Sequence, residues 1–569
     1  MSKDLFVGVD GKARKAKEFY VGVNGKARRI VKAYIGDENG KARPFWEKGS
    51  SIIEDSLEFV SDNSFTMEAP KTWDGTLTYN NGNGWTAWNG SQISSSNIDG
   101  RQRIYFRGSR NTVIRGQNAS SNNAWKITGS NVECNGNIEC LLDYQKVAAG
   151  EHPTMGSYCY NAMFNKCSSL TTAPQLPATN LAMNCYASMF SGCSSLTTAP
   201  QLPATNLAIS CYYNMFSGCS SLTTAPELPA MTLEQSCYRR MFTGCSKLTT
   251  APELPATILA VYCYYDMFSG CSSLTTAPEL PAISLVDDCY HSMFEECSSL
   301  TTAPQLPATT LAGYCYAFMF NGCSKLTTAP ELPATILANF CYRSMFTGCS
   351  KLTTAPELPA TTLTIYCYNN MFSFCSSLTT APELPATTLA QSCYRSMFNY
   401  CDRLTTAPEL PATVMVKECY QNMFTDCSSL TTAPALPATT LAESCYREMF
   451  YGCSSLTEAP SLLATTLAVG CYREMFRSCV NLTRIPALNA TTLVDYCYNS
   501  MFKNCPKVKP ATEQSENYSV SYRVPIFATA TSQPANSMTD MFSSSTESNV
   551  EYHINTTYWL PKTASVIIS

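Results

Sequence analysis

The chain has 569 residues, enough for several domains, and its formal net charge is only −4. Charged residues make up 14% of the sequence, which gives no general attraction to nucleic acid, so we expect no nucleic-acid partner. No apolar stretch is long enough to span a membrane, and the first residues lack the apolar run of a secretion signal. We therefore expect neither membrane insertion nor export.

Residues 1–48 contain a short basic motif three times. Val7–Arg14 reads V-G-V-D-G-K-A-R, Val21–Arg28 repeats it with Asn in place of Asp, and Ile35–Arg43 carries a longer variant. Asp-Gly and Asn-Gly pairs favour tight β-hairpin turns, because both residues tolerate positive φ. So small a β unit is marginally stable alone, which leaves two interpretations, a solvated β-ribbon or a docking segment that needs a partner.

The repeated V-G-V-[D/N]-G-K-A-R pattern resembles the amino-terminal segments of virion proteins, often tail-associated, from phages of gut bacteria. The resemblance covers residues 1–46. It implies that residues 1–48 attach the protein to other virion proteins.

Residues 49–155 are predicted to form a small β-sandwich-like domain, which makes the amino-terminal region all-β. Leu57–Val60 and Gly75–Tyr79 alternate apolar and polar residues, and Gly and Asn residues separate such segments. Tryptophans of this region could line a sugar site, although core packing is their commoner role. They are Trp73, Trp85, Trp88 and Trp125.

Residues 156–508 repeat one 26-residue sequence, of which Cys341–Tyr366 is a typical copy. The first cysteine of each copy recurs from Cys159 to Cys497 in thirteen steps of 26 residues, which gives fourteen copies without insertion or deletion. A fixed period of this length is typical of a solenoid, in which each unit buries its apolar side against its neighbours.

The positions of one copy, counted from its first cysteine as position 1, divide into constant and variable sets. Positions 1, 2, 5, 6, 9, 12, 18 and 23 are usually Cys, Tyr, Met, Phe, Cys, Leu, Leu and Leu. On a helical wheel, positions 24, 1, 2, 5 and 6 share one half, which predicts an amphipathic helix of about eleven residues. Glycine is frequent at position 8 and fits the left-handed end of such a helix.

The sequence Leu-Thr-Thr-Ala-Pro at positions 12–16 predicts a short parallel strand that stops at the proline. Since helices are wider than strands, we expect the helices on the convex side and the strands on the concave side. The predicted fold class is therefore an α/β solenoid.

The pattern C-x-x-L-T-x-A-P-x-L-P, followed by C-Y-x-x-M-F, resembles the BspA-like leucine-rich repeats of bacterial surface proteins. This resemblance implies a leucine-rich-repeat fold and a role in adhesion to surfaces. One departure is that those proteins are typically exported, whereas this chain begins with the phage-like segment.

Twenty-eight of the thirty cysteines belong to the repeats. Positions 1 and 9 would lie about 12 Å apart along a helix, too far for a disulfide, so we predict buried free thiols. Cys134 and Cys140 lie outside the repeats and could be paired or free. A zinc site is disfavoured because the histidines His152, His291 and His553 are widely spread, and we expect no cofactor of any kind.

Residues 509–569 are predicted to form a carboxy-terminal cap. Ser537–Phe542 repeats the C-Y-x-x-M-F pattern without its cysteine. Terminal repeats are often atypical because they must cover the end of the stack.

Two surfaces of the solenoid could bind a partner. One carries Gln or Glu at position 17, from Gln175 to Glu409, a row that we interpret as solvated and that could bind cations. The other is the variable helix face, whose Tyr, Phe and Arg residues suit recognition, with neutral drift as the alternative. The candidate ligand-binding residues of this face are Tyr213, Arg239, Tyr262, Tyr265, Tyr314, Phe318, Phe340, Arg343, Tyr366, Arg395, Arg447, Arg473 and Tyr496.

The sequence leaves three classes of function. The favoured one is a non-enzymatic phage virion protein, of the tail or decorating the capsid, that binds a host cell-surface glycan or protein and is compatible with a homo-oligomer. The alternative is a bacterial cell-surface adhesin of the BspA-like type. An enzyme is disfavoured, because no paired carboxylates and no Ser-His-Asp or Cys-His arrangement stand out.

Overall fold

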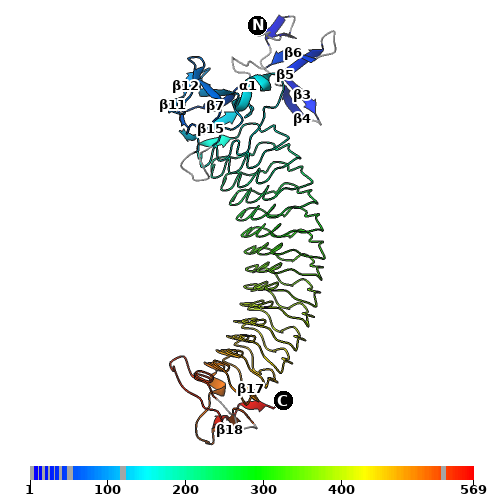
Figure 1. The fold of residues 1–569 in the computed structure, drawn as a ribbon, viewed down its shortest axis with the longest axis vertical. Helices are drawn as coiled ribbons and strands as arrows, with labels where there is room; N and C mark the ends of the chain where they lie inside the picture. The colour runs from blue at the N-terminus through cyan, green and yellow to red at the C-terminus, as the bar shows by residue number, and fades with distance from the viewer. Residues whose placement is uncertain are drawn as a thin grey trace.

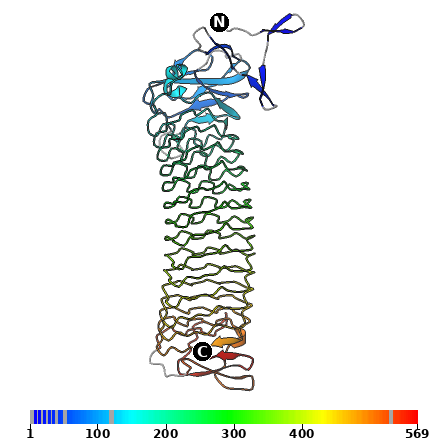
Figure 2. The ribbon, with the colours of Figure 1, turned by 90° about the vertical axis from the view of Figure 1, so that its right-hand side faces the viewer.

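The computed structural model describes residues 55–115, 124–526 and 533–568, together with the backbone of six short strands between residues 6 and 47. The repeats form one curved rod of stacked coils between an amino-terminal and a carboxy-terminal unit (Figure 1). Seen from the side, the coils form an even ladder (Figure 2). The 26-residue repeats therefore build a continuous solenoid rather than separate modules.

The six amino-terminal strands pair as three antiparallel hairpins. The pairs are β1 (Phe6–Val9) with β2 (Lys12–Lys15), β3 (Phe19–Val23) with β4 (Lys26–Ile30), and β5 (Lys32–Gly36) with β6 (Ala42–Glu47). The Asp-Gly and Asn-Gly turns themselves lie outside the described residues, and the docking role assigned to residues 1–48 stays a prediction.

Two sheets form the unit that precedes the solenoid. The larger sheet has the order β10-β9-β13-β7-β15-β16, with β12 also paired to β13, and the smaller has the order β11-β8-β14. The strands are β7 (Leu57–Ser61), β8 (Thr66–Glu68), β9 (Thr76–Asn80), β10 (Thr86–Ala87), β11 (Ile93–Ser94), β12 (Ser96–Ile98), β13 (Arg101–Ser109), β14 (Lys126–Thr128), β15 (Val132–Asn135) and β16 (Leu170–Thr172).

This unit is not all-β, which corrects the prediction. Helix α1 (Cys140–Ala148) packs against β13 and is interrupted at Asp143, whose backbone is extended. The sequence Cys-Leu-Leu-Asp-Tyr-Gln-Lys-Val-Ala has apolar residues at both ends, and only its first three residues are buried. So short a helix shows too little periodicity to be recognised in the sequence.

Three of the four tryptophans pack in the core of this unit. Trp73 and Trp88 stack with their rings 5.5 Å apart, and Trp125 is completely buried against Trp88. Only Trp85 is partly exposed, and the guanidinium of Arg107 lies 4.0 Å over its ring. Core packing, the commoner of the two roles considered, therefore holds for three of them.

The larger sheet continues directly into the solenoid. Strand β15 pairs antiparallel with β7 on one side and parallel with β16, in the first repeat, on the other. The ring of Phe164, at position 6 of that repeat, meets the edges of Phe59 and Trp125. The amino-terminal unit thus covers the apolar end of the first coil and crosses the predicted boundary at residue 155.

The helix predicted in each repeat is wrong. Residues 156–505 are all described and contain no α-helix. In the C-Y-x-x-M-F segment, alternate backbone N–H groups donate to the residue three places earlier and to the next coil. Met189 donates to the carbonyl of Tyr186 at 3.2 Å, whereas Phe190 donates to Met215 of the following repeat at 3.0 Å. An α-helix would keep all these bonds within one segment, so the segment is a ladder of turns, and no helices occupy the convex side.

Every fourth residue of this ladder has a left-handed backbone. Positions 26, 4 and 8 have positive φ throughout the repeats, as in Asn184 (54°), Ser188 (55°) and Gly192 (74°). Glycine at position 8 was therefore correctly associated with left-handed φ, but in a turn and not at a helix end. The apolar positions 1, 5 and 9, and 2 and 6, are four apart, a spacing that a helical wheel also accepts over two turns.

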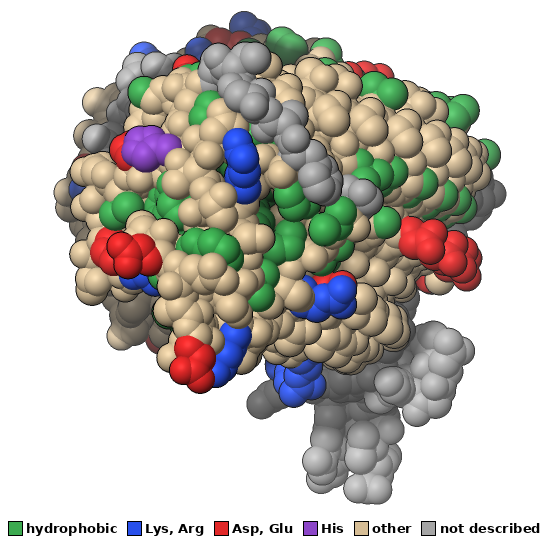
Figure 3. All heavy atoms as spheres, turned by 90° about the horizontal axis from the view of Figure 1, so that it is seen from below, with side chains coloured by type: hydrophobic (Ala, Val, Ile, Leu, Met, Phe, Trp, Pro, Cys, Tyr) green, Lys and Arg blue, Asp and Glu red, His purple; other side chains and the backbone are tan. Residues whose placement is uncertain are grey.

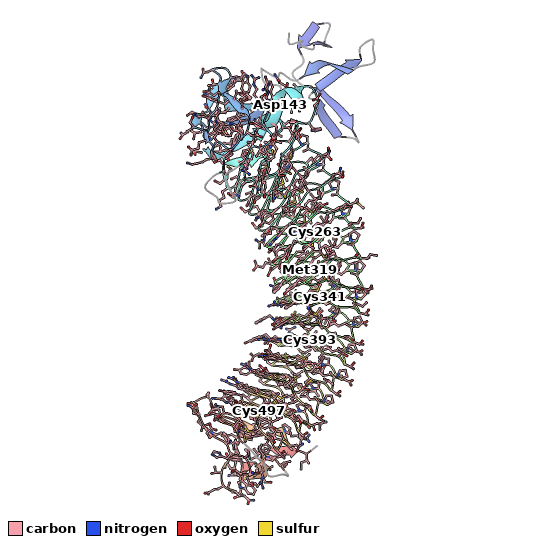
Figure 4. All side chains as sticks on the ribbon, viewed as in Figure 1. Asp143, Cys263, Met319, Cys341, Cys393 and Cys497 are labelled. Atoms are coloured by element: carbon pink, nitrogen blue, oxygen red, sulfur yellow. The ribbon has the colours of Figure 1, made fainter. Side chains whose placement is uncertain are left out.

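Inside the rod, each aromatic ring stacks on the equivalent ring of the next coil. The tyrosines at position 2 lie 5.9 Å apart between Tyr186 and Tyr212, and the phenylalanines at position 6 lie 5.7 Å apart between Phe190 and Phe216. The labelled cysteines and Met319 follow one another along the interior of the rod (Figure 4). The constant positions therefore form continuous columns.

All thirty cysteines are free and buried, as predicted for the repeats, and Cys134 and Cys140 are free as well. Each thiol at position 9, after the first copy, donates to the phenylalanine carbonyl of the preceding coil, as Cys193 does to Phe164 at 3.0 Å. The repeated cysteine is therefore a small apolar residue with a weak donor that reaches across coils.

The predicted strand is shorter than expected. Between most coils, single bridges such as Thr198 to Thr224 and Thr302 to Thr328 replace a continuous parallel sheet. Proline at position 16 lacks the N–H that the ladder would need. Longer parallel pairing occurs at the two ends of the rod. There, β16 pairs two residues with β15 across a register shift, and β17 (Arg484–Pro486) pairs three residues with a strand of the carboxy-terminal unit.

Two separate segments cap the carboxy-terminal end. Ser537–Phe542 continues the turn ladder, since Phe502 donates to Met541 at 2.8 Å and stacks on Phe542 at 5.2 Å. Strand β20 (Ser565–Ile567) pairs parallel with β17. The remaining elements are the 3₁₀-helix η1 (Pro506–Val508), β18 (Tyr518–Arg523) and β19 (Thr557–Pro561). Viewed from this end, the surface carries few charged side chains (Figure 3).

A glycine substitution distinguishes the turn ladder from an α-helix. Asn214, at position 4, has φ of 56° and a buried Oδ1 without a partner, so Asn214→Gly should leave the thermal midpoint unchanged or raise it. A helix would lose about 1 kcal/mol. Ala187→Gly at position 3, where φ is negative, is the control and should lower the midpoint. Equal losses in both variants would contradict the turn ladder.

Alkaline conditions should unfold the solenoid cooperatively. Burial raises the pKa of Cys211 and Cys263 from 9.0 to about 12. Because the folded pKa is raised, this stabilisation is complete below pH 9 and is lost as the pH rises towards 12. We expect thiolate absorbance to appear together with loss of the circular dichroism signal above pH 9. Thiolate absorbance at pH 9 without loss of the circular dichroism signal would contradict this prediction.

Candidate ligand-binding surface

The candidate residues lie on the outer side of the turn ladder, in three columns that run along the rod. Position 3 provides Tyr213, Arg239, Tyr265, Arg343, Arg395, Arg447 and Arg473, position 4 provides Phe318, and position 26 provides Tyr262, Tyr314, Phe340, Tyr366 and Tyr496. All are half-buried except Tyr496, which is exposed. The candidates from Tyr213 to Arg395 lie in neighbouring coils, of which only Cys367–Ser392 has none, whereas the last three lie nearer the carboxy-terminal end.

The variable positions are less exposed than a helix face would be. Small side chains in these columns are buried, with exposures of 3% for Ser292, 4% for Asn369 and 0% for Ser392. The cause is the short spacing of the coils, which lets each larger neighbour cover the position beneath it. Only coils with large side chains present a contact surface.

Arg239 forms one cluster of this surface. Its guanidinium lies 4.6 Å from the ring centre of Tyr265, 5.2 Å from Tyr262 and 5.9 Å from Tyr213. Cation–π contacts of this kind stabilise exposed pairs by about 0.5–1 kcal/mol. The four side chains come from three successive coils, so the cluster depends on the stacking.

His291 joins this cluster to the next and was not among the predicted residues. Its ring stacks on Tyr265 at 4.5 Å and lies 5.5 Å from Phe318. Burial, together with the nearby positive charges of Arg343 and Arg239, lowers the pKa of His291 to about 4. The ring is therefore neutral at neutral pH and acts as an aromatic spacer. Its place at position 3 was the signal that could have identified it.

Tyr314, Phe340 and Tyr366 form a stack along position 26. The first two rings are 4.4 Å apart and the last two 5.0 Å apart, with nearly parallel planes. The stack ends at Tyr366, because position 26 of the next repeat is Ser392. In the described part of the chain, no second ring or guanidinium covers the other face of Tyr366.

The arginines of this surface differ in their partners. Arg395 pairs with Glu418 at 3.0 Å, and Arg447 and Arg473 pair with the glutamates that follow them in sequence. Arg343 lies over Phe318 at 5.4 Å and Phe340 at 5.8 Å. Among the described residues no carboxylate forms an ion pair with Arg343, and its buried Nε has no acceptor.

A shallow groove of about 600 Å³ lies where the ring stack ends. It crosses several coils and contains two guanidiniums, three further polar side chains and no carboxylate. Its lining residues are Tyr314, Phe340, Arg343, Tyr366, Asn369, Asn370, Arg395 and Ser396. The groove thus combines positive charge, hydrogen-bonding groups and an aromatic face.

The stacked rings occupy backbone positions that bulky residues disfavour. Tyr314, Phe340 and Tyr366 have φ of 54°, 61° and 55°, a region that costs an L-residue about 1–2 kcal/mol. Equivalent coils carry Asn184 or Ser210, whose short side chains fit this region more easily. Stacking between the rings offsets part of this free-energy cost. The fold itself does not require aromatic residues at position 26, because other coils carry Asn or Ser there.

The competing surface, at position 17, has no comparable arrangement. Its Gln and Glu side chains, such as Gln305 and Glu331, are exposed. Within residues 55–115, 124–526 and 533–568, no three His, Cys, Asp or Glu side chains converge as a metal site. In the same ranges no helix has the length and apolar character needed to cross a membrane.

Comparison with known proteins concerns the solenoid. The profile of the family described as BspA type leucine rich repeat region, with six copies, matches overlapping segments: 156–301, 215–353, 292–431, 339–461 and 392–524. A solved structure, described as the crystal structure of a TLR13–ssRNA13 complex, is 14% identical with a TM-score of 0.22. The match covers 62% of this chain and 48% of that chain, so this chain spans about half of its length. No curated protein matches the chain.

Proposed function

This chain belongs to the BspA-type leucine-rich-repeat family, and from that membership we propose that it is a non-enzymatic, adhesin-type binding protein of the bacterial cell surface. Its partner is a glycan or protein on another cell or surface. The observation that carries the proposal is the contrast between a constant stacked core and an outer turn ladder rich in Tyr, Phe and Arg.

The rod supplies what such a protein needs. Core columns depend on positions 1, 2, 5, 6 and 9, whereas positions 3, 4 and 26 vary without loss of the coil-to-coil hydrogen bonds, which are made by the backbone. Contact residues can therefore change while the fold is kept. Tyrosine and arginine provide contact area and hydrogen bonding at a small entropic cost.

Attachment to cells tests this function. The full chain, labelled with a fluorophore, should bind a subset of epithelial or bacterial cells in a saturable way, measured by flow cytometry. Replacing Tyr314, Phe318, Phe340, Arg343 and Tyr366 together by Ser should weaken attachment roughly tenfold or more, as expected for central contact residues. Circular dichroism should stay unchanged, and attachment equal to that of the parent would exclude this surface.

The amino-terminal repeat favours a second candidate, a phage virion protein of the tail or capsid surface. Three copies of a basic hairpin motif, resembling virion segments, precede the rod. In that case residues 1–48 bind other virion proteins and the rod binds the host receptor.

Deletion of residues 1–48 distinguishes the two candidates. If the protein is a virion component, the shortened chain should fold but be absent from purified phage particles, detected with an antibody against the rod. Normal incorporation of the shortened chain would contradict the docking role of residues 1–48. Absence of the full-length chain from particles would leave the adhesin as the remaining candidate.

A further inference from the structure

We propose that the groove at the end of the ring stack binds a polysaccharide that carries carboxylate groups. One sugar ring lies against the open face of Tyr366, and carboxylates of the polymer lie beside Arg343 and Arg395. The proposal rests on the binding function given above and specifies its ligand.

The open ring face is the first argument. Phe340 covers one face of Tyr366 at 5.0 Å, and Ser392 leaves the other face without a stacked neighbour. The groove begins on that side, since Asn370, Arg395 and Ser396 come from the following coils. A flat apolar face bordered by polar groups fits the alternating C–H and hydroxyl surface of a sugar ring.

The charge of the groove is the second argument. Its lining includes Arg343 and Arg395 but no Asp or Glu. Arg395 pairs with Glu418 at 3.0 Å, whereas no carboxylate of the described residues forms an ion pair with Arg343. A guanidinium with free donors in a fixed plane binds a carboxylate through two hydrogen bonds. The unpaired Arg343 therefore selects an anionic ligand.

Neutral hydrogen-bonding groups complete the site. The amide of Asn370 donates to the Oδ1 of Asn369 at 3.1 Å, and the amide of Asn369 donates to the carbonyl of Arg395 at 3.3 Å. This chain of bonds fixes the amides along the floor of the groove. Amides and the Ser396 hydroxyl suit sugar hydroxyls, whereas an apolar peptide or lipid chain would need an apolar lining.

The form of the groove favours a polymer over a single sugar. The groove is open and crosses the coils that carry Tyr314, Phe340, Tyr366 and Arg395 at equivalent places. Coils spaced by about 4.8 Å present their side chains at roughly the length of one sugar unit. A linear chain can therefore contact successive coils.

The test uses three carboxylate polymers as probes: polygalacturonate, hyaluronate and polysialic acid. Binding of the full chain to each immobilised polymer is measured by biolayer interferometry. We expect at least one to bind. Tyr366→Ser and Arg343→Asn should each weaken that binding roughly tenfold or more, as loss of a charge-assisted bond or a stacked face requires.

The substitutions copy residues that other coils carry, Ser392 at position 26 and Asn369 at position 3, so the fold should be kept. Matched controls are Tyr158→Ser, at the equivalent of position 26 before the first copy, and Arg477→Asn, at position 7. Both lie outside the groove and should alter binding less than twofold. If polygalacturonate binds, its methyl ester, which keeps the sugar but not the charge, should bind at least tenfold more weakly.

Failure of the polysaccharide proposal can be distinguished from failure of the adhesin function. If none of the three polymers binds, or if the groove variants bind like the parent, the proposal is wrong. Cell attachment that an excess of the three polymers does not inhibit would reject this ligand class while the binding function stands. Absence of cell attachment, with polymer binding that depends on Arg343 and Tyr366, would instead reject the adhesin role alone.

Discussion

The hydrogen bonds between coils are the interaction on which the rest of the structure depends. Along the C-Y-x-x-M-F segment, alternate N–H groups leave their own coil and bind the next one, as Phe190 does with Met215. The left-handed residues at positions 26, 4 and 8 turn the chain so that this alternation is possible. A buried backbone group without a partner is costly, so coils held in this way share one register along the rod.

The fixed register explains the core and the surface together. Residues at equivalent positions lie above one another, so Tyr stacks on Tyr and Phe stacks on Phe. For the same reason, each thiol at position 9 after the first copy reaches a phenylalanine carbonyl of the preceding coil, as Cys193 does with Phe164. The same register places Tyr314, Phe340 and Tyr366 in one outer column. A side chain at the surface is therefore half-buried by its neighbours, and the outer surface is a set of short columns that begin and end where the sequence changes size.

Much of the architecture could be predicted from the sequence. The 26-residue period led to the solenoid, to free buried cysteines and to the cap at Ser537–Phe542. The helix was wrongly predicted, because apolar residues at positions 1, 5 and 9 satisfy both a helix and a four-residue turn repeat. Local pattern cannot distinguish the two, since the deciding hydrogen bonds are made to residues 25 places further along the chain.

The candidate site could be predicted only as a set of residue types. Position 26 already aligned Tyr314, Phe340 and Tyr366 in sequence, but the groove and the open face of Tyr366 needed the coordinates. The difference between Arg343 and Arg395 depends on whether a carboxylate of a neighbouring coil, here Glu418, reaches the guanidinium. His291 was missed because it is the only histidine at position 3 of the repeats and was considered only as a possible metal ligand.

Far-ultraviolet circular dichroism of the full chain at neutral pH tests the turn ladder most directly. The described residues contain a single α-helix, Cys140–Ala148, of nine residues. The account therefore predicts a spectrum without the paired minima of an α-helix. A strong helical spectrum, as a helix in each of the fourteen repeats would give, would contradict the coil-to-coil hydrogen bonding and the outer columns that depend on it.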